Sequence, residues 1–269
     1  MEKTAPVERM GYSTQDRLRQ LAQQQGLEGS LYSDAKGDPL DRARRRAALG
    51  GCRPPPRQRN LEAILHKALL QANADLVVDE LDGDWFYHFS RLSENTGNPR
   101  MQGLWATILL RELEQPGSFS RRTLEVLEKL SLKETQLFAK VVNMALTVGQ
   151  EYRLVIGLYK RHALGGGHTR LLPMGQFGLP YSALATLMEL GLLQSSELVS
   201  ADLRQIPLQF SMGGHRGQLL GNRRRVHLTY YRFSVIGDEL ARLVATEPDS
   251  KFETELKRLA EGELTLSWQ

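Results

Sequence analysis

Cysteine is nearly absent from this sequence, and long apolar runs are missing altogether. The 269 residues include one cysteine, Cys52, so an internal disulfide framework and a cysteine-rich zinc site are both excluded. No run of about 18 apolar residues occurs, which argues against a transmembrane helix. The first twenty residues also lack the apolar core of a signal peptide. We therefore expect a cytoplasmic protein that has no membrane partner.

A uniform excess of positive charge is missing too. The net charge is +4, but residues 1–59 hold twelve Lys and Arg against seven Asp and Glu, a net of +5. Residues 60–269 therefore sum to −1. Because nucleic-acid-binding domains are usually basic as a whole, this distribution argues against a fold that binds nucleic acid over its entire surface.

The N-terminal segment, residues 1–56, is poor in large apolar side chains. Asp41–Ala47 reads DRARRRA, and RPPPR at Arg53–Arg57 then stops any helix, because proline removes a backbone donor. This composition predicts a flexible basic leader that ends in a proline-rich linker. The alternative is an arm that contacts phosphate through four arginines. These are Arg42, Arg44, Arg45 and Arg46.

Residues 57–130 show the three- and four-residue spacing of amphipathic helices. A long helix is expected from Asn60, a candidate N-cap. A second helix is expected after Asp82 or Asp84, because a carboxylate at a helix start accepts backbone N–H groups and favours the helix dipole. A third is expected from Met101. The segment therefore predicts a helical domain.

The serines of the central stretch are predicted to begin helices. Pro116-Gly117 ends one helix, and Ser118 or Ser120 caps the next. Ser131–Glu134 reads SLKE, which is a capping box ahead of another helical run. Because the G-x-S-x-G pattern of a nucleophile elbow is missing, we do not assign a catalytic serine here.

Candidate reaction centres are few. Asp82, Asp84 and His88 could ligate a metal, but no EF-hand loop or paired-histidine motif accompanies them. Gly165–Gly167 lacks the G-K-[ST] of a phosphate loop. An enzyme would need a convergent cluster drawn from His66, Asp82, Asp84, His88, Glu94 and Glu112. Because the Glu-x-x-His pattern of carboxylate-metal bundles is missing, we predict no enzyme, no cofactor and no metal site.

Five stretches carry a family resemblance. They are RQRNLEAI at Arg57–Ile64, DGDW at Asp82–Trp85, MQGLWATIL at Met101–Leu109, PGSFSRRTL at Pro116–Leu124 and LSLKETQLF at Leu130–Phe138. Together they resemble a group of uncharacterised bacterial proteins known only as domains of unknown function. More distantly, the runs LEKLS and LMELGLL resemble the Abi-alpha family, which is named for abortive infection. The resemblance implies a bacterial, cytosolic protein linked to phage defence, and it brings no catalytic residues.

The C-terminal half combines helix and strand signals. Tyr152–Leu158 is rich in β-formers but could equally extend the preceding helix. Tyr181–Leu190 is expected to be helical, with Gly191 just past its end. Two strand-like segments, Ile206–Met212 and Val226–Phe233, flank a glycine-rich stretch that we interpret as a hairpin tip. This order is typical of a winged helix, with the hairpin as its wing.

We therefore predict a mainly α (α+β) protein. Its parts are a leader at 1–56, a helical domain at 57–130, a winged-helix-like module at 131–246, and a C-terminal helix and tail at 247–269. Within the last part, Lys251–Ala260 is amphipathic and could pack on the body of the protein or on a second copy. A homo-oligomer is therefore one alternative.

Arginines gather around the predicted wing. No acidic residue lies between Asp202 and Asp238, a stretch that holds Arg204, Arg216, Arg223, Arg224, Arg225 and Arg232. Such a cluster suits phosphate or an acidic partner. The helix in the recognition position, Tyr181–Leu190, offers no Arg, Lys, Asn or Gln for base edges.

Two functions follow from this sequence. The first is a non-enzymatic interaction or adaptor protein whose partner is an unidentified protein. Its pathway is left open by the sequence, with phage defence and stress as the candidates. The alternative is a nucleic-acid-binding protein of weak sequence preference, which uses the arginine-rich hairpin and the N-terminal arm. Winged helices serve both roles, and a fold does not fix a function.

Overall fold

The computed structural model describes residues 12–24, 56–73, 77–78, 80–162, 164–245 and 247–268. The chain divides into two compact units, Met1–Glu128 and Lys129–Gln269. Cys52 and most of the segment predicted as a leader lie outside the described residues. Among the described residues, no helix is both long and apolar enough to span a membrane.

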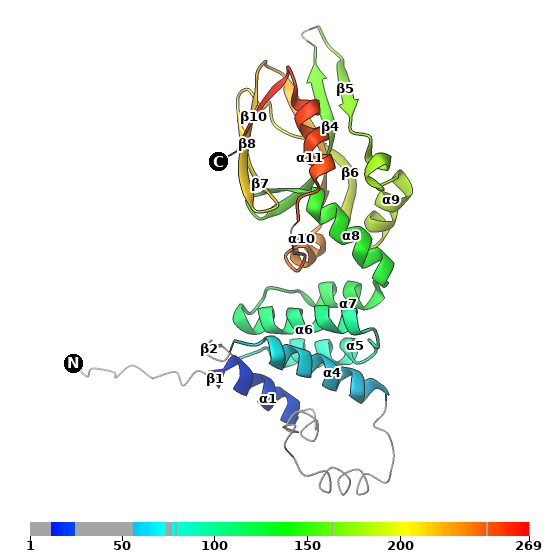
Figure 1. Ribbon diagram of the computed structural model, residues 1–269, viewed down its shortest axis with the longest axis vertical. Coiled ribbons are helices and arrows are strands. Elements are labelled where there is room, and N and C mark those ends of the chain that lie inside the picture. The colour runs from blue at the N-terminus through cyan, green and yellow to red at the C-terminus, as the bar shows by residue number, and fades with distance from the viewer. Residues whose placement is uncertain are drawn as a thin grey trace, which may run out of the picture. The chain divides into compact units, whose positions relative to one another are not determined.

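The first unit is helical (Figure 1). Helix α4 contacts α1, α5 and α6. A short antiparallel pair, β1 with β2, joins two distant segments. The bounds are β1 Tyr12–Ser13, α1 Thr14–Gln24, α4 Pro56–Gln71, β2 Val77–Val78, α5 Gly83–Ser93, α6 Pro99–Glu114 and α7 Arg121–Lys129.

Aromatic side chains form the centre of this unit. The Phe89 ring stacks on Trp85 at 5.3 Å between centroids and meets Trp105 edge-on at 5.4 Å. Each indole N–H is satisfied, since Trp85 donates to the Phe119 carbonyl and Trp105 donates to the Thr96 hydroxyl. The tryptophans are therefore packing residues that bury large apolar areas and lose no hydrogen bond.

Several predicted helix starts are confirmed. The Asp82 carboxylate accepts the N–H groups of Asp84 and Trp85, and Ser131 with Glu134 forms the capping box of α8. Ser120 accepts the N–H of Thr123 at the start of α7. The prediction for Asn60 was wrong, because α4 begins at Pro56 and the Asn60 amide instead donates to the Glu94 carbonyl.

The second unit is built on a large sheet. In the described part of the chain, eight strands form one antiparallel sheet. Seven of them follow the order β10-β8-β7-β3-β4-β9-β6, and the eighth, β5, pairs with the C-terminal half of β4. The strand bounds are β3 Leu146–Val148, β4 Glu151–Arg161, β5 Gly167–Leu171, β6 Leu193–Val199, β7 Leu208–Met212, β8 His215–Gly221, β9 Val226–Phe233 and β10 Leu264–Trp268.

Helices pack on this sheet (Figure 1). Phe138 of α8 meets Phe233 of β9 at 5.7 Å, and Phe252 of α11 meets Phe177 of η1 edge-on at 5.4 Å. Phe252, Leu256 and Leu259 are buried within the single chain, so α11 packs on the body of this unit. The bounds are α8 Leu132–Met144, η1 Met174–Phe177, α9 Tyr181–Glu189, α10 Val235–Ala241 and α11 Ser250–Ala260.

The predicted winged-helix-like module, and with it the mainly α fold class, was wrong. The two strands assigned to a wing do not pair with each other, because β7 lies between β8 and β3 while β9 lies between β4 and β6. Helix α9, assigned as the recognition helix, turns Leu184 and Leu187 inward and contacts β6. Among the described residues, an eight-stranded antiparallel sheet takes the place of a two-stranded hairpin.

Glycines inside β8 account for this difference between sequence and structure. The stretch between the two presumed wing strands was interpreted as a loop because it is glycine-rich, yet it contains β8. At Gly217 a Cβ atom would lie 2.7 Å from the Phe210 ring, and at Gly221 it would lie 2.7 Å from the Arg204 backbone nitrogen. These glycines mark close approaches inside a strand and its neighbours, a use that is indistinguishable by composition from a flexible turn.

Candidate nucleic-acid interface

The structure separates the predicted site arginines into groups. Arg42, Arg44, Arg45 and Arg46 lie outside the described residues. Arg204 and the run Arg223–Arg225 come together, because the Arg204 guanidinium donates to the Gly221 carbonyl and Asp202 holds both segments. Arg216 lies near the start of β8, five residues from Gly221 and so roughly 17 Å along the strand from that loop.

Arg232 is held in an ion-pair network. It lies at the far end of β9, opposite Arg153 of β4. Its guanidinium is 2.6 Å from one oxygen of Glu151, and that of Arg153 is 3.0 Å from the other. Arg153 also lies over the Tyr230 ring, at 5.2 Å from its centroid. Both arginines are therefore engaged by their own sheet, which leaves Arg232 poorly placed to bind a partner.

The loop Asn222–Arg225 is organised by one carboxylate. Asp202 accepts the backbone N–H of Arg204 at 3.1 Å and that of Arg225 at 2.8 Å. Desolvation by burial raises the pKa of Asp202, but these N–H donors and the nearby His227 outweigh it, so the net pKa lies below the ordinary value. The ionised carboxylate fixes the backbone from which Arg223 and Arg224 project, both of them exposed.

Arg225 has an unusual backbone. Its φ of 67° places it in the left-handed region, where it is alone among the described non-glycine residues. An L-residue pays roughly 1–2 kcal/mol for that conformation. Residues under such strain cluster at functional sites, so this backbone outlier marks the loop Asn222–Arg225 as a candidate site.

A second basic segment, missed by the sequence reasoning, adjoins this loop. The backbone N–H of Arg161, the last residue of β4, donates to the Arg225 carbonyl at 3.0 Å. Across the β4–β5 pair, His168 lies opposite Lys160 and Arg170 lies opposite Leu158. A signal for this hairpin was present, since Gly165–Gly167 follows a β-rich run and a glycine turn between two such runs predicts a hairpin.

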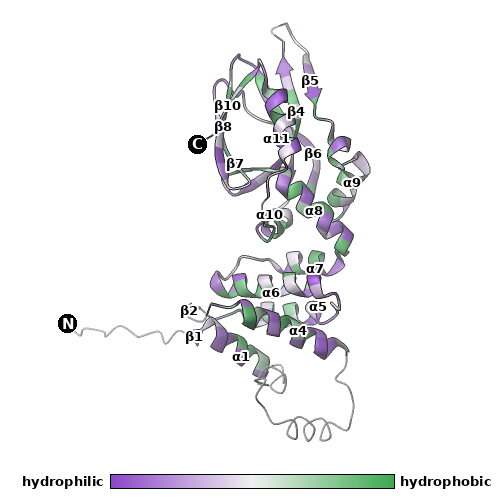
Figure 2. Ribbon diagram, in the orientation of Figure 1, coloured by the Kyte–Doolittle hydropathy of each residue, from purple (hydrophilic) through white to green (hydrophobic). Residues whose placement is uncertain are grey.

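These segments form what we call the basic tip. It comprises Lys160, Arg161, His162, His168, Arg170, Arg204, Arg223, Arg224 and Arg225. The hydrophilic colouring of the outer ends of β4 and β5 in Figure 2 marks the hairpin part of it. The whole tip belongs to the second unit, which Figure 1 shows with the β4–β5 hairpin projecting at one end.

Acidic residues near the basic tip are outnumbered. Lys160 is paired with Glu263 at 2.6 Å, and the Asp202 carboxylate is used by backbone donors. Glu261 is exposed on the segment that leads to Glu263, whose carbonyl accepts the N–H of Asn222. In the described part of the chain, these three carboxylates accompany the seven lysine and arginine side chains of the tip, so the tip keeps a positive excess although residues 60–269 sum to −1.

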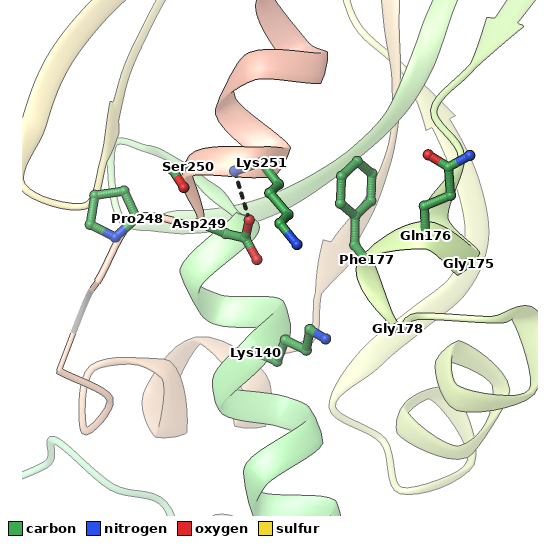
Figure 3. Close-up of a pocket in the computed structure, with 9 residues that line it drawn as sticks. All are labelled: Lys140, Gly175, Gln176, Phe177, Gly178, Pro248, Asp249, Ser250 and Lys251. Carbon is green, nitrogen blue, oxygen red and sulfur yellow. Dashed lines mark hydrogen bonds between the residues drawn. The ribbon is translucent and has the colours of Figure 1, made fainter.

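A separate depression of about 600 Å³ lies beside the start of α11 (Figure 3). The ammonium groups of Lys140 and Lys251 point toward it, but both side chains are exposed. Asp249 already accepts the N–H groups of Lys251 and Phe252. The first backbone donors of the helix are therefore used by its own cap, and the depression does not form a built anion site.

The acidic and histidine side chains that could form a reaction centre have structural contacts. Asp82 caps α5, and Asp84 lies 3.5 Å from the Arg121 guanidinium. His88 lies 3.4 Å from Glu125. The buried Glu112 accepts the N–H groups of Gly117 and Phe119 and so holds the Pro116-Gly117 turn. Within the described ranges, no group of three His, Cys, Asp or Glu side chains could hold a metal ion.

Fold and site together define an α+β protein whose antiparallel sheet ends in a basic tip. The chain belongs to a family described as protein of unknown function (DUF2806), whose model matches residues 41–257. The predicted membership of a domain-of-unknown-function family is thereby confirmed, while the more distant Abi-alpha resemblance stays a prediction. No curated protein and no solved structure matches the chain.

Proposed function

We propose that the protein binds nucleic acid through phosphate contacts at the basic tip, with weak sequence preference. The observation that carries this proposal is the convergence of three segments, the end of β4, the loop after Asp202 and the loop Asn222–Arg225, on one exposed cluster of arginines. Guanidinium groups offer planar pairs of donors that match phosphate oxygens. Their binding releases the counterions that surround a nucleic acid.

Weak sequence preference is the expected mode for this surface. Base reading requires an element that enters a groove with Asn, Gln or Arg aimed at base edges. Helix α9 packs its apolar side on β6 and carries none of these residue types. Contacts to phosphate position a protein on nucleic acid without reading its bases.

The same arginines could instead bind an acidic protein partner. The adaptor function expected from the sequence therefore stays a prediction. The same holds for the cytoplasmic location, the phage-defence link and the non-enzymatic assignment. We place nucleic acid first because it presents phosphate charges at close, regular spacing, which several clustered arginines can bind at once.

Fluorescence anisotropy with labelled oligonucleotides of about 20 nucleotides tests the proposal. Titrations at roughly 50 and 200 mM salt should show binding that weakens steeply as salt rises. Arg223→Ala/Arg224→Ala should weaken binding by about ten-fold and reduce the slope of log K against log salt by roughly 1.4 to 2.

The matched control is Arg122→Ala/Arg216→Ala, which removes the same charge from exposed positions outside the tip. This variant should bind as the natural chain does. An equal loss in the control, or no binding at 50 mM salt, would sink the proposal. Equal affinity for poly-glutamate of matched charge would move the assignment to an acidic protein partner.

A further inference from the structure

We infer that the nucleic acid held at the basic tip is single-stranded and that one of its bases stacks on Tyr159. The inference rests on the proposed function and adds the substrate class to it. Tyr159 of β4 lies between Thr169 of β5 and His227 of β9 in the sheet register. Its ring centroid is 6.0 Å from that of His227, with the two planes inclined by 37°.

The tyrosine shares its sheet face with Arg161, the last residue of β4. Residues two apart on a strand point to the same side, so Tyr159 and Arg161 lie on one face, roughly 7 Å apart. His227 lies on that face as well, because residues directly opposite each other in a sheet share a side. Arg225 lies two positions before His227, and its backbone carbonyl accepts the N–H of Arg161. Tyr159, His227 and Arg161 thus share one face of the sheet, next to the loop that carries Arg223 and Arg224.

Gly167 lets the tyrosine lie across the sheet. A Cβ atom at Gly167 would lie 2.2 Å from Tyr159 Cε2 and 2.4 Å from its hydroxyl oxygen. The outer end of the ring therefore occupies the space directly above the β5 backbone. All five residues of β5 are exposed, and Tyr159 keeps part of its surface in solvent. Because the β5 backbone at Gly167 lies against one side of the Tyr159 ring, the other side is available to a partner.

His227 is held in a fixed orientation beside it. Its Nδ1 is 2.9 Å from the Ser200 carbonyl oxygen, and since a carbonyl can only accept, Nδ1 carries the hydrogen. The Ser200 hydroxyl in turn accepts the Leu228 N–H. Val199 extends the same face, because it pairs with Thr229, and its side chain is 50% exposed. We call Tyr159 and His227 the aromatic face.

The aromatic face points to single strands because a duplex hides the faces of its bases. Proteins that bind single strands combine a positively charged surface for the backbone with aromatic rings on which bases stack. The basic tip supplies the first part and Tyr159 the second. A duplex could use only the arginines and would gain nothing from the tyrosine.

The test compares Tyr159→Leu with Tyr159→Phe in the full chain. The probes are a labelled oligo-dT of about 15 nucleotides and a labelled blunt-ended DNA duplex of about 15 base pairs, measured by anisotropy at fixed salt. Tyr159→Leu should weaken oligo-dT binding by about 5- to 150-fold, the range for loss of one stacked base. Tyr159→Phe keeps an aromatic ring and should bind oligo-dT as the natural chain does. The salt slope should stay unchanged, because no charge is removed. Binding of the blunt-ended duplex should not respond to either variant.

An independent measurement covers the case in which Tyr159→Leu fails to fold. An oligonucleotide that carries 5-iodouracil should photocrosslink in the natural chain to Tyr159 or His227, identified by mass spectrometry. Unchanged oligo-dT affinity in a folded Tyr159→Leu, or crosslinks confined to other residues, would overturn this inference. The proposed function would then still stand if Arg223→Ala/Arg224→Ala lost binding. It would fall separately if that variant bound normally.

Discussion

At the scale of single residues, the backbone of Arg225 connects stability with the site. Its left-handed conformation connects the loop Asn222–Arg225 to β9. Its backbone N–H donates to the Asp202 carboxylate, and its carbonyl accepts the N–H of Arg161. One strained residue therefore joins the loop to the β4–β5 hairpin. The strain is tolerated because hydrogen bonds on both sides over-determine the conformation.

Substitution of Arg225 separates its backbone role from its charge. Glycine adopts positive φ readily, so Arg225→Gly should leave the free energy of unfolding unchanged or raise it by up to about 1 kcal/mol. Arg225→Val should lower it by at least about 1 kcal/mol, since a β-branched residue strongly resists this region. Urea unfolding measures both. Arg224→Gly is the control and should destabilise slightly, because φ at Arg224 is not positive. A larger loss for Arg225→Gly than for Arg225→Val would contradict this account.

Asp238 predicts a pH dependence of stability. Desolvation by burial raises the pKa of this carboxyl, Glu151 raises it further, and the N–H of Tyr152 with Arg232 and Arg242 only partly offsets this. The folded state therefore binds the proton more tightly than the unfolded state, whose pKa is about 3.9. The contribution of Asp238 to stability consequently falls as pH rises from about 4 through the raised pKa.

Asp238→Asn removes that titration and keeps an oxygen to accept the Tyr152 N–H. The free energy of unfolding of the variant, relative to the natural chain, should increase as pH rises through this window and then level off. Urea titrations at steps between pH 4 and pH 7 provide the measurement. Glu189→Gln, an exposed carboxylate on α9, is the control. A difference that shrinks with rising pH would show that the folded state instead favours the ionised form.

At the scale of elements, local signals were reliable and non-local ones were not. The Asp82 cap and the Ser131–Glu134 box were predictable because each is made within three residues of sequence. Strand pairing has no such locality, since β10 pairs with β8 and β9 pairs with β4. A glycine-rich stretch reads as a turn unless its neighbours across the sheet are known, so β8 was missed.

The same difference between local and non-local signals holds for the residues of the candidate site. Arg223–Arg225 was found because the run is contiguous. Arg161 was missed because it meets Arg225 only through a pairing between residues 64 positions apart in the chain. Tyr159 carried no signal as a binding residue, since its partner ring at His227 and its support at Gly167 come from two other strands. Arg216 and Arg232 were included because sequence proximity suggested spatial proximity.

Two helix glycines give opposite predictions. At Gly103 of α6 a Cβ atom would meet nothing within 4 Å, so Gly103→Ala should stabilise by about 0.5–1 kcal/mol through helix propensity. At Gly237 of α10 the same atom would lie 2.1 Å from the Leu192 carbonyl oxygen. Backbone cannot move aside cheaply, so Gly237→Ala should destabilise by about 1–3 kcal/mol. Thermal and urea unfolding measure each sign. Equal effects would mean that α10 shifts away from Leu192 freely.

At the scale of the whole molecule, the charge is concentrated in two places. The segment 1–59 carries a net of +5, and the rest of the chain sums to −1 although it includes the basic tip. A protein with this distribution has little long-range attraction for nucleic acid outside those two regions. Affinity should therefore depend on a small number of arginines, and the two regions should contribute separately.

Replacement of Arg42, Arg44, Arg45 and Arg46 by glutamine tests the N-terminal contribution. If these side chains contact phosphate, the slope of log K against log salt for oligo-dT should fall by roughly 3, at about 0.7 per phosphate released. Combination with Arg223→Ala/Arg224→Ala should add the two losses of binding free energy, because sites that share no partner are additive within about 0.5 kcal/mol. An unchanged slope in the four-residue variant would confine binding to the basic tip. A combined loss well below the sum would mean that both regions compete for the same phosphates, and the separate roles given to them here would then be wrong.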